Sequence, residues 1–211
     1  MNAVLLAKMI QEAGLASLTP EALNRFDLYL DLLLKWNSRL NLTAIRDPET
    51  ILRRHFVECI QCAQALPALK GSTLLDFGSG AGLPGIPIAI CRPDIHVTLA
   101  ESQQKKSAFL REAVRTLRLP ATEVFAGRVE NMPQALQFDI VALRAVDRMR
   151  EACKAAFPRV RMNGRIVVFT TQETRAELKK ALPAIESWNE MPSAGLNHGL
   201  LLIGQRPNPK A

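Results

Sequence analysis

A glycine-rich loop lies between an apolar segment and a helical stretch in the run Leu74-Leu75-Asp76-Phe77-Gly78-Ser79-Gly80-Ala81-Gly82-Leu83-Pro84-Gly85. Glycines at alternate positions let a ligand approach bare backbone, and the helix that follows offers free N–H groups. This run predicts a strand–loop–helix unit that binds a small polar ligand. The spacing from Gly80 to Gly85 also fits the G-x-G-x-x-G of dinucleotide enzymes, so the loop alone leaves the ligand open.

The remaining pattern predicts one α/β domain with a helical extension. Apolar residues recur at helical spacing up to about Pro67, and Thr19-Pro20-Glu21 is typical of a helix start. After Lys70, short apolar runs alternate with helical stretches, which is typical of βαβ units around a parallel sheet. The 211 residues leave room for one core of this kind. We expect a helical extension over 1–70 and the ligand-binding domain over 71–211.

Seven strands are expected in a mixed sheet. Five should be parallel, at Thr73–Phe77, His96–Ala100, Thr122–Phe125, Asp139–Leu143 and Arg165–Phe169. Two more, Ser187–Met191 and Gly199–Gln205, are separated only by turn residues, among them Pro192, Gly195 and Asn197, so they should form an antiparallel hairpin. A parallel sheet that ends in an antiparallel strand is typical of Rossmann-like class I methyltransferases. In nicotinamide-binding domains, by contrast, all strands are parallel, including the one at the edge of the sheet.

Two carboxylates indicate which class of ligand the loop binds. Glu101 ends the second strand, where an acid can accept hydrogen bonds from both ribose hydroxyls. Asp76, at the tip of the first strand, suits the ammonium group of S-adenosylmethionine but would repel a pyrophosphate. Pro84 has no N–H to offer a phosphate. We therefore expect S-adenosylmethionine as cofactor, held by the loop glycines Gly78, Gly80 and Gly82 together with these acids.

A nicotinamide-dependent oxidoreductase is the main alternative. Arg144 is the one residue in its favour, because a cation there could pair with a phosphate of the dinucleotide. Other residues speak against it. Tyr29, the only tyrosine, has no lysine four residues later, and His96 does not lie at a strand's carboxyl end.

The later strand ends constrain the reaction. Val129 and Glu130 follow the third strand, where they could contact the adenine. Arg144 follows the fourth strand, where amino-group methyltransferases carry an Asn/Asp-Pro-Pro run and C5-pyrimidine enzymes a cysteine nucleophile. Neither occurs here. We expect an acceptor that is already nucleophilic, such as a ring nitrogen, with Arg144 positioning cofactor or target, and we assign no catalytic base.

Charge favours a polyanionic partner. The formal net charge is +7, and lysines and arginines gather on both sides of the loop, at Arg46, Arg53, Arg54, Lys105, Lys106, Arg111, Arg115 and Arg118. An RNA-facing rim is expected, and an RNA-binding module without catalysis is a third hypothesis. Trp36, Asn37, Asn41 and His55 are interpreted as structural residues.

Nothing in the sequence predicts a membrane span or a signal peptide, so we expect a cytoplasmic protein. The four cysteines fit a reducing compartment. Cys59 and Cys62 form a single C-x-x-C with no second pair, so no metal site is expected.

The chain resembles the RsmG (GidB) family of small-subunit ribosomal RNA (guanine-N7) methyltransferases over nearly its whole length. The resemblance rests on runs that the fold does not require: Lys35-Trp36-Asn37, Leu40-Asn41-Leu42-Thr43-Ala44-Ile45, Arg54-His55-Phe56, the loop from Asp76 to Ile88, Lys105-Lys106 with Phe109-Leu110, and Arg144-Ala145.

This resemblance implies methyl transfer from S-adenosylmethionine to guanine N7 of 16S ribosomal RNA, alone or in the ribosomal subunit, by a protein that we expect to be a monomer. It implies cofactor contacts at Gly78, Leu83, Val129, Glu130 and Arg144. The chain departs from the family pattern at Glu58-Cys59, where Asp-Ser is common, and at Thr170-Thr171, where many relatives carry Lys-Gly.

Overall fold

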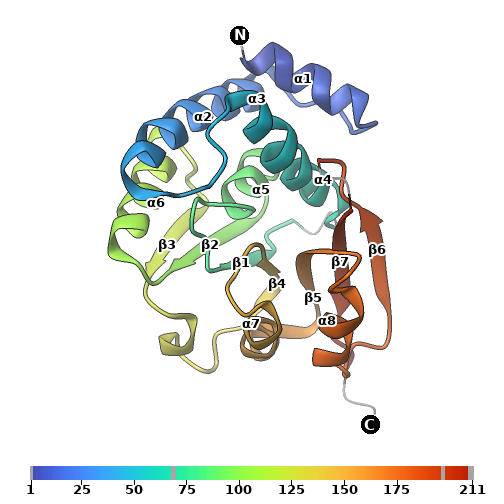
Figure 1. Cartoon of the computed structure of the whole chain (residues 1–211). Coiled ribbons are helices and arrows are strands. Elements are labelled where there is room, and N and C mark those ends of the chain that lie inside the picture. Colours follow the sequence, from blue (N-terminus) through green and yellow to red (C-terminus); the bar gives the residue numbers. More distant parts are fainter. Residues whose placement is uncertain (1, 68–69, 196–197, 209–211) are drawn as a thin grey trace.

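Seven strands form one twisted sheet in the computed structural model, which describes residues 2–67, 70–195 and 198–208 (Figure 1). Their spatial order is β3-β2-β1-β4-β5-β7-β6. The strands are β1 (Thr73–Phe77), β2 (His96–Glu101), β3 (Thr122–Ala126), β4 (Phe138–Leu143), β5 (Val160–Thr171), β6 (Trp188–Pro192) and β7 (Gly199–Gln205). The expected mixed seven-stranded sheet is thereby confirmed.

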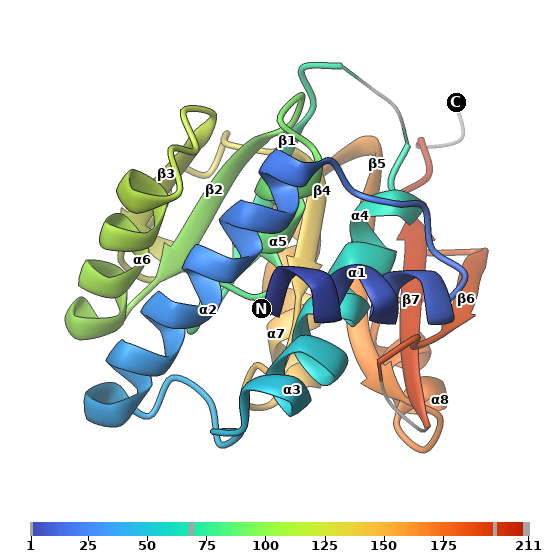
Figure 2. The same cartoon turned by 90° about the horizontal axis from the view of Figure 1, so that it is seen from above.

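Helices cover both faces of this sheet (Figure 2). The N-terminal third forms α1 (Asn2–Glu12), α2 (Pro20–Leu40), α3 (Pro48–Ile51), the π-helical turn η1 (Leu52–Phe56) and α4 (Val57–Ala65). The crossovers contain α5 (Gly85–Cys91), α6 (Gln104–Thr116), α7 (Met149–Ala156) and α8 (Arg175–Ala181), with short 3₁₀ turns η2 (Val129–Asn131) and η3 (Phe157–Arg159). Within the described ranges, no helix is both long and apolar enough to cross a membrane.

The order in which strands are added to the sheet reverses at β1, which pairs in parallel with β2 on one side and β4 on the other. Leu74 lies between Val97 of β2 and Ile140 of β4. Parallel α/β sheets bind ligands at such a switch point, outside the carboxyl ends of the strands. The glycine loop leaves β1 at this place.

The hairpin of β6 and β7 is antiparallel, as its short connection predicts, and β7 also pairs antiparallel with β5. Of the expected turn residues, Asn197 lies outside the described part of the chain. β5 begins at Val160, five residues before the predicted start, because Phe138 pairs with Val160 and Ile140 already pairs with Arg165. The intervening residues bulge out of register, with Asn163 in the left-handed region at φ 61°.

Each face of the sheet has its own apolar core. One contains buried residues of α1, α2, α4, α5 and α6, with Phe26, Phe56 and Phe109 fully buried. The other packs α7 and α8 against the opposite face through side chains such as Cys153 and Leu178. The N-terminal helices therefore share a core with the sheet.

Two local features bring the N-terminal helices to the glycine loop. Helix α2 begins at Pro20, where Thr19 Oγ1 accepts a hydrogen bond from the Ala22 N–H at 3.2 Å, and it ends at Asn41 in the left-handed conformation. The Tyr29 hydroxyl in this helix donates to the Ala81 carbonyl at 2.6 Å. The segment after Asn41 thus lies across the carboxyl edge of the sheet.

Candidate cofactor-binding site

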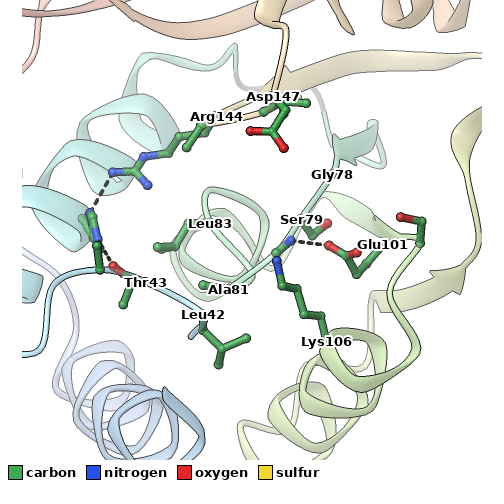
Figure 3. A pocket seen from close by; sticks show the side chains of 16 residues that line it. Leu42, Thr43, Gly78, Ser79, Ala81, Leu83, Glu101, Lys106, Arg144 and Asp147 are labelled. Carbon is green, nitrogen blue, oxygen red and sulfur yellow. Dashed lines mark hydrogen bonds between the residues drawn. The ribbon is translucent and has the colours of Figure 1, made fainter. Parts of the chain in front are cut away.

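A cavity of about 470 Å³ opens at the carboxyl ends of β1, β2 and β4 (Figure 3). Its size falls in the range of ~300–1,000 Å³ that is usual for small-molecule sites. The lining residues come from the segment after α2, from η1, from the loops at the three strand ends and from the first turn of α6: Leu42, Thr43, Ala44, His55, Gly78, Ser79, Gly80, Ala81, Leu83, Glu101, Ser102, Lys106, Arg144, Ala145, Val146 and Asp147.

The glycine loop forms the cavity floor with bare backbone. Gly78 and Gly80 have positive φ angles of 75° and 53°, which a residue with a side chain rarely adopts. A Cβ atom on Gly80 would meet only the Gly78 carbonyl oxygen, at 3.9 Å, so it would point into open space. The Gly78 and Ser79 N–H groups donate to the Ala100 carbonyl and fix the loop against β2. A ligand can therefore lie directly on this backbone.

Glu101 forms the wall next to the loop, as predicted from its place at the end of β2. Its carboxylate accepts hydrogen bonds from the Gly80 N–H at 2.9 Å and the Gln103 N–H at 2.7 Å. The side chain is thereby held in one orientation, and each oxygen keeps a further acceptor site. A ligand with vicinal hydroxyls could donate to both oxygens.

Asp76 lies beneath the loop, outside the cavity lining. Its Oδ2 accepts a hydrogen bond from the Gly85 N–H at 3.1 Å, while Oδ1 is buried without a partner among the described residues. Burial raises the pKa of this carboxyl to about 7, against the opposing effect of the Gly85 hydrogen bond. Gly82 also lies outside the lining. A Cβ there would stand 2.4 Å from a carbon of Ile86, so this position faces the packed interior and not the cavity.

Val129 and Glu130, expected near the adenine, lie in η2 after β3 and outside the lining of this cavity. Val129 is buried, and its carbonyl accepts a hydrogen bond from Arg159 at 2.9 Å. Glu130 is exposed. Of the nine predicted cofactor positions, the structure therefore brings five together around the cavity: Gly78, Gly80, Leu83, Glu101 and Arg144.

Arg144 enters the cavity from the end of β4 and is held by partners far away in the sequence. Its Nε and Nη2 both donate to Glu58 Oε2 at 3.0 Å, and the two side chains are only 11% and 3% exposed. The other Glu58 oxygen accepts from the Ser193 hydroxyl at 2.8 Å. No described residue accepts a hydrogen bond from Nη1 of Arg144. These two N–H groups remain for a ligand.

Arg144 Nη2 has two further partners, the Arg54 carbonyl at 3.4 Å and the His55 ring. Because an arginine can only donate, His55 Nδ1 must accept the 2.8 Å hydrogen bond from Nη2, which leaves the proton on Nε2. That nitrogen then donates to Thr43 Oγ1 at 3.0 Å. Burial and the Arg144 charge lower the pKa of His55 to about 4. A neutral, fully bonded imidazole orients its neighbour and is poorly suited to be a general base.

Several lining residues were not among the predicted site positions. Thr43 and Ala44 belong to the Asn-Leu-Thr-Ala-Ile run, and that run was the available signal for them. Asp147 and Lys106 extend toward the cavity from opposite sides, after β4 and within α6 (Figure 3). Trp36, by contrast, packs against Phe109 with ring centroids 5.9 Å apart, which fits its structural interpretation.

Solved structures with the same fold include methyltransferases of low sequence identity. The S-adenosylmethionine-dependent methyltransferase from Aquifex aeolicus aligns with a TM-score of 0.61 at 14% identity, over 76% of this chain and 94% of its own. P. horikoshii TYW2 in complex with MeSAdo aligns with a TM-score of 0.56 at 14% identity, over 72% of this chain and 61% of its own. The fold is therefore that of class I methyltransferases.

Sequence comparison is more specific. The ribosomal RNA small subunit methyltransferase G of Clostridium perfringens (strain SM101) is 36% identical over 88% of this chain and 84% of its own length. The protein of that name from Moorella thermoacetica is 34% identical over 97% of this chain and 90% of its own. The model of the GidB family, described as rRNA small subunit methyltransferase G, matches residues 22–194. The chain therefore belongs to the GidB family of small-subunit ribosomal RNA methyltransferases.

Proposed function

We propose that this protein transfers a methyl group from S-adenosylmethionine to N7 of a guanosine in small-subunit (16S) ribosomal RNA. Family membership supports the RNA methyltransferase activity. The observation that carries the cofactor assignment is the cavity itself, with bare glycine backbone, a buried carboxylate and an arginine around one space. A nicotinamide-dependent oxidoreductase and a noncatalytic RNA-binding module have no comparable support.

The residues present fit S-adenosylmethionine. We assign Glu101 to the ribose hydroxyls, Gly78, Gly80 and Leu83 to contacts along the cofactor, and the free Nη1 group of Arg144 to the methionine carboxylate. Asp76, Gly82, Val129 and Glu130 remain proposed cofactor positions although they lie outside the cavity lining. For Asp76, the buried oxygen without a partner supports an ionic contact with the methionine ammonium group, provided that the loop shifts on binding.

Little acid–base chemistry is required of the protein. The cofactor supplies a methyl group activated by a sulfonium charge. Guanine N7 carries an in-plane lone pair and no proton, so no residue has to remove one. Arg144, held by Glu58 and His55, orients what it binds, and the loop and Glu101 keep the remaining contacts fixed. We therefore propose that no side chain is an essential base.

Exposed cations support an RNA-facing rim around the cavity. Arg46 and Arg54 lie on the N-terminal side and Lys105 on α6, all exposed, while half-buried Lys106 lines the cavity itself. We propose a monomer acting in the cytoplasm, with residues 1–70 as a helical extension that helps to bind RNA and 71–211 as the cofactor-binding domain.

Transfer of labelled methyl groups tests this function. Small ribosomal subunits lacking the modification would be incubated with the protein and methyl-labelled S-adenosylmethionine. Label should enter the ribosomal RNA, and calorimetry should show binding of S-adenosylhomocysteine but not of NAD. Label confined to protein, or NAD binding without a response to S-adenosylhomocysteine, would overturn the proposal.

A further inference from the structure

A second cavity, of about 410 Å³, adjoins the cofactor cavity, and Ala145 lines both. It lies at the carboxyl ends of β4 and β5, where α7 and α8 approach each other (Figure 1). Cavities beside Trp36, Leu119 and Asn189 share no lining residue with the cofactor cavity. Since methyl transfer needs donor and acceptor within ~3–3.5 Å, the acceptor must enter from a space that opens onto the cofactor.

The walls of this second cavity suit a purine nucleotide. Phe169 and Leu178 form an apolar surface, while the hydroxyls of Thr170, Thr171 and Thr174 lie together, with Thr170 and Thr174 oxygens 2.6 Å apart. Arg148, which is exposed, adds a cation to the lining. A flat base can lie against the apolar part, and its sugar and phosphate can reach the hydroxyls and the arginine.

The junction between the two cavities has an unusual backbone. Ala145 and Arg148 both have φ of 50°, in the left-handed region that residues with side chains rarely adopt. Non-glycine residues in this region are strained, and such strain gathers at functional sites. The strained segment is the one that separates the cofactor cavity from the second cavity.

Guanine has a geometry that this pair of cavities can read. N7 lies on the edge of the purine next to the Watson–Crick edge, so a guanine with N7 toward the cofactor presents N1–H and the N2 amino group to one side, toward the neighbouring cavity. A carboxylate can accept hydrogen bonds from both groups, whereas adenine presents an acceptor at N1. Glu177 lines the second cavity from α8, the helix after β5. In the sheet, β5 lies beyond β4 as seen from β1, so Glu177 is on the side of the cavity away from the glycine loop.

We propose that the second cavity binds the target guanosine and that Glu177 recognises its Watson–Crick edge; this proposal rests on the function proposed above. Arg150 Nη1 stands 3.6 Å from Glu177 Oε1, and the two side chains are 49% and 60% exposed, so this pair leaves the Glu177 carboxylate open to a ligand. Glu177 is thus a specificity-determining residue. The threonines at positions 170 and 171, where many relatives carry Lys-Gly, belong to the same nucleotide site.

The charge of Glu177 makes its test informative. A carboxylate that merely faced the phosphate backbone would repel RNA, so Glu177→Gln would then improve RNA binding. A carboxylate that reads guanine has the opposite effect, and Glu177→Gln should lower kcat/KM for small subunits about tenfold or more. Affinity for S-adenosylhomocysteine should stay within about twofold. Glu21→Gln is the matched control, because Glu21 is also an exposed carboxylate paired with one arginine, Arg25, but lies on α2 and does not line the cavity.

A cavity-filling change provides a second, independent measurement. Thr174→Trp should block the nucleotide and reduce methylation at least tenfold with unchanged cofactor affinity, while Lys180→Trp, at an exposed position of α8 outside the cavity, should have little effect. Unchanged or faster methylation by Glu177→Gln, or full activity of Thr174→Trp, would overturn the proposal. Absence of guanosine methylation by the wild-type protein would instead contradict the proposed function.

Discussion

Breaking the ion pair between Glu58 and Arg144 should destabilise the protein more than breaking an exposed ion pair, because the two side chains are only 3% and 11% exposed. Removing one partner of such a pair leaves an uncompensated charge and typically costs ~3–5 kcal/mol. At ~2–4 °C per kcal/mol for a chain of this size, Glu58→Ala should lower Tm by roughly 6–20 °C. In Glu58→Gln the amide oxygen can still accept both hydrogen bonds from Arg144, but the negative charge of the carboxylate is gone. The free energy of unfolding should then fall by ~2–3 kcal/mol.

A double variant separates this electrostatic effect from lost packing. Replacing both groups by apolar side chains, as in Glu58→Leu with Arg144→Met, removes the unpaired charge and should recover most of the stability lost in either single variant. Cofactor affinity should remain low in all of them, because the orienting contact is gone. Urea unfolding and titration with S-adenosylhomocysteine measure the two effects separately.

An exposed ion pair supplies the control. Glu12→Gln removes the partner of Lys8, whose side chain is 71% exposed, and of Arg53, whose side chain is 51% exposed, and it should change the free energy of unfolding little. The reasoning would be refuted if Glu58→Ala destabilised the protein no more than Glu12→Gln, or if the double variant were as unstable as the sum of the two single ones.

Three further predictions concern the cavity and its rim. Glu101→Ala should weaken S-adenosylhomocysteine binding by ~1.5–3 kcal/mol in calorimetry, the loss expected for charge-assisted hydrogen bonds, and unchanged affinity would exclude Glu101 from the site. Burial raises the pKa of Asp76 to about 7, above its usual value of 3.8, so ionisation costs the folded state stability as pH rises from about 4 to about 7. Asp76→Asn should therefore be stabilising relative to wild type at pH 8 but not at pH 4 in urea unfolding, and an equal effect at both pH values would contradict this. RNA affinity should fall as salt rises: for each single-strand phosphate that the protein neutralises, log K should drop by about 0.7 per tenfold increase in salt concentration. An affinity that does not change with salt would argue against the basic rim.

Strand and loop patterns predicted the sheet because each strand is a short buried apolar run bounded by turn residues. Every strand except β5 begins and ends within one residue of its expected range. β5 is longer than predicted, because the run from Arg161 to Gly164, with Asn163 and Gly164 at its end, has turn-forming residues yet stays in the strand as a bulge. Local composition cannot reveal pairing across the sheet that keeps such a run extended.

The site was predictable where backbone conformation determines it. Gly78 and Gly80 require positive φ, and Glu101 ends a strand next to them, so their convergence follows from the βαβ unit. The partners of Arg144 did not follow, because Glu58 and His55 precede it by 86 and 89 residues. The orientation of Asp76 beneath the loop was equally hidden, since a strand position does not tell on which side of a loop a side chain packs.

Analysis of the methylated nucleoside tests the central claim most directly. Small subunits methylated by the protein in a single turnover would be digested to nucleosides and compared with authentic methylguanosines by mass spectrometry, at pH values from about 6 to 9 and saturating S-adenosylmethionine. The account predicts 7-methylguanosine as the product and a rate that does not change with pH. N7 has no proton to lose, and His55, with its pKa lowered to about 4 by burial and by Arg144, stays neutral throughout. Asp76, with its pKa raised to about 7 by burial, acts on cofactor affinity, which saturating S-adenosylmethionine removes from the measured rate. A product methylated at an exocyclic amine or at C5 of a pyrimidine, or a rate that rises with pH and loses this dependence in one variant, would contradict it.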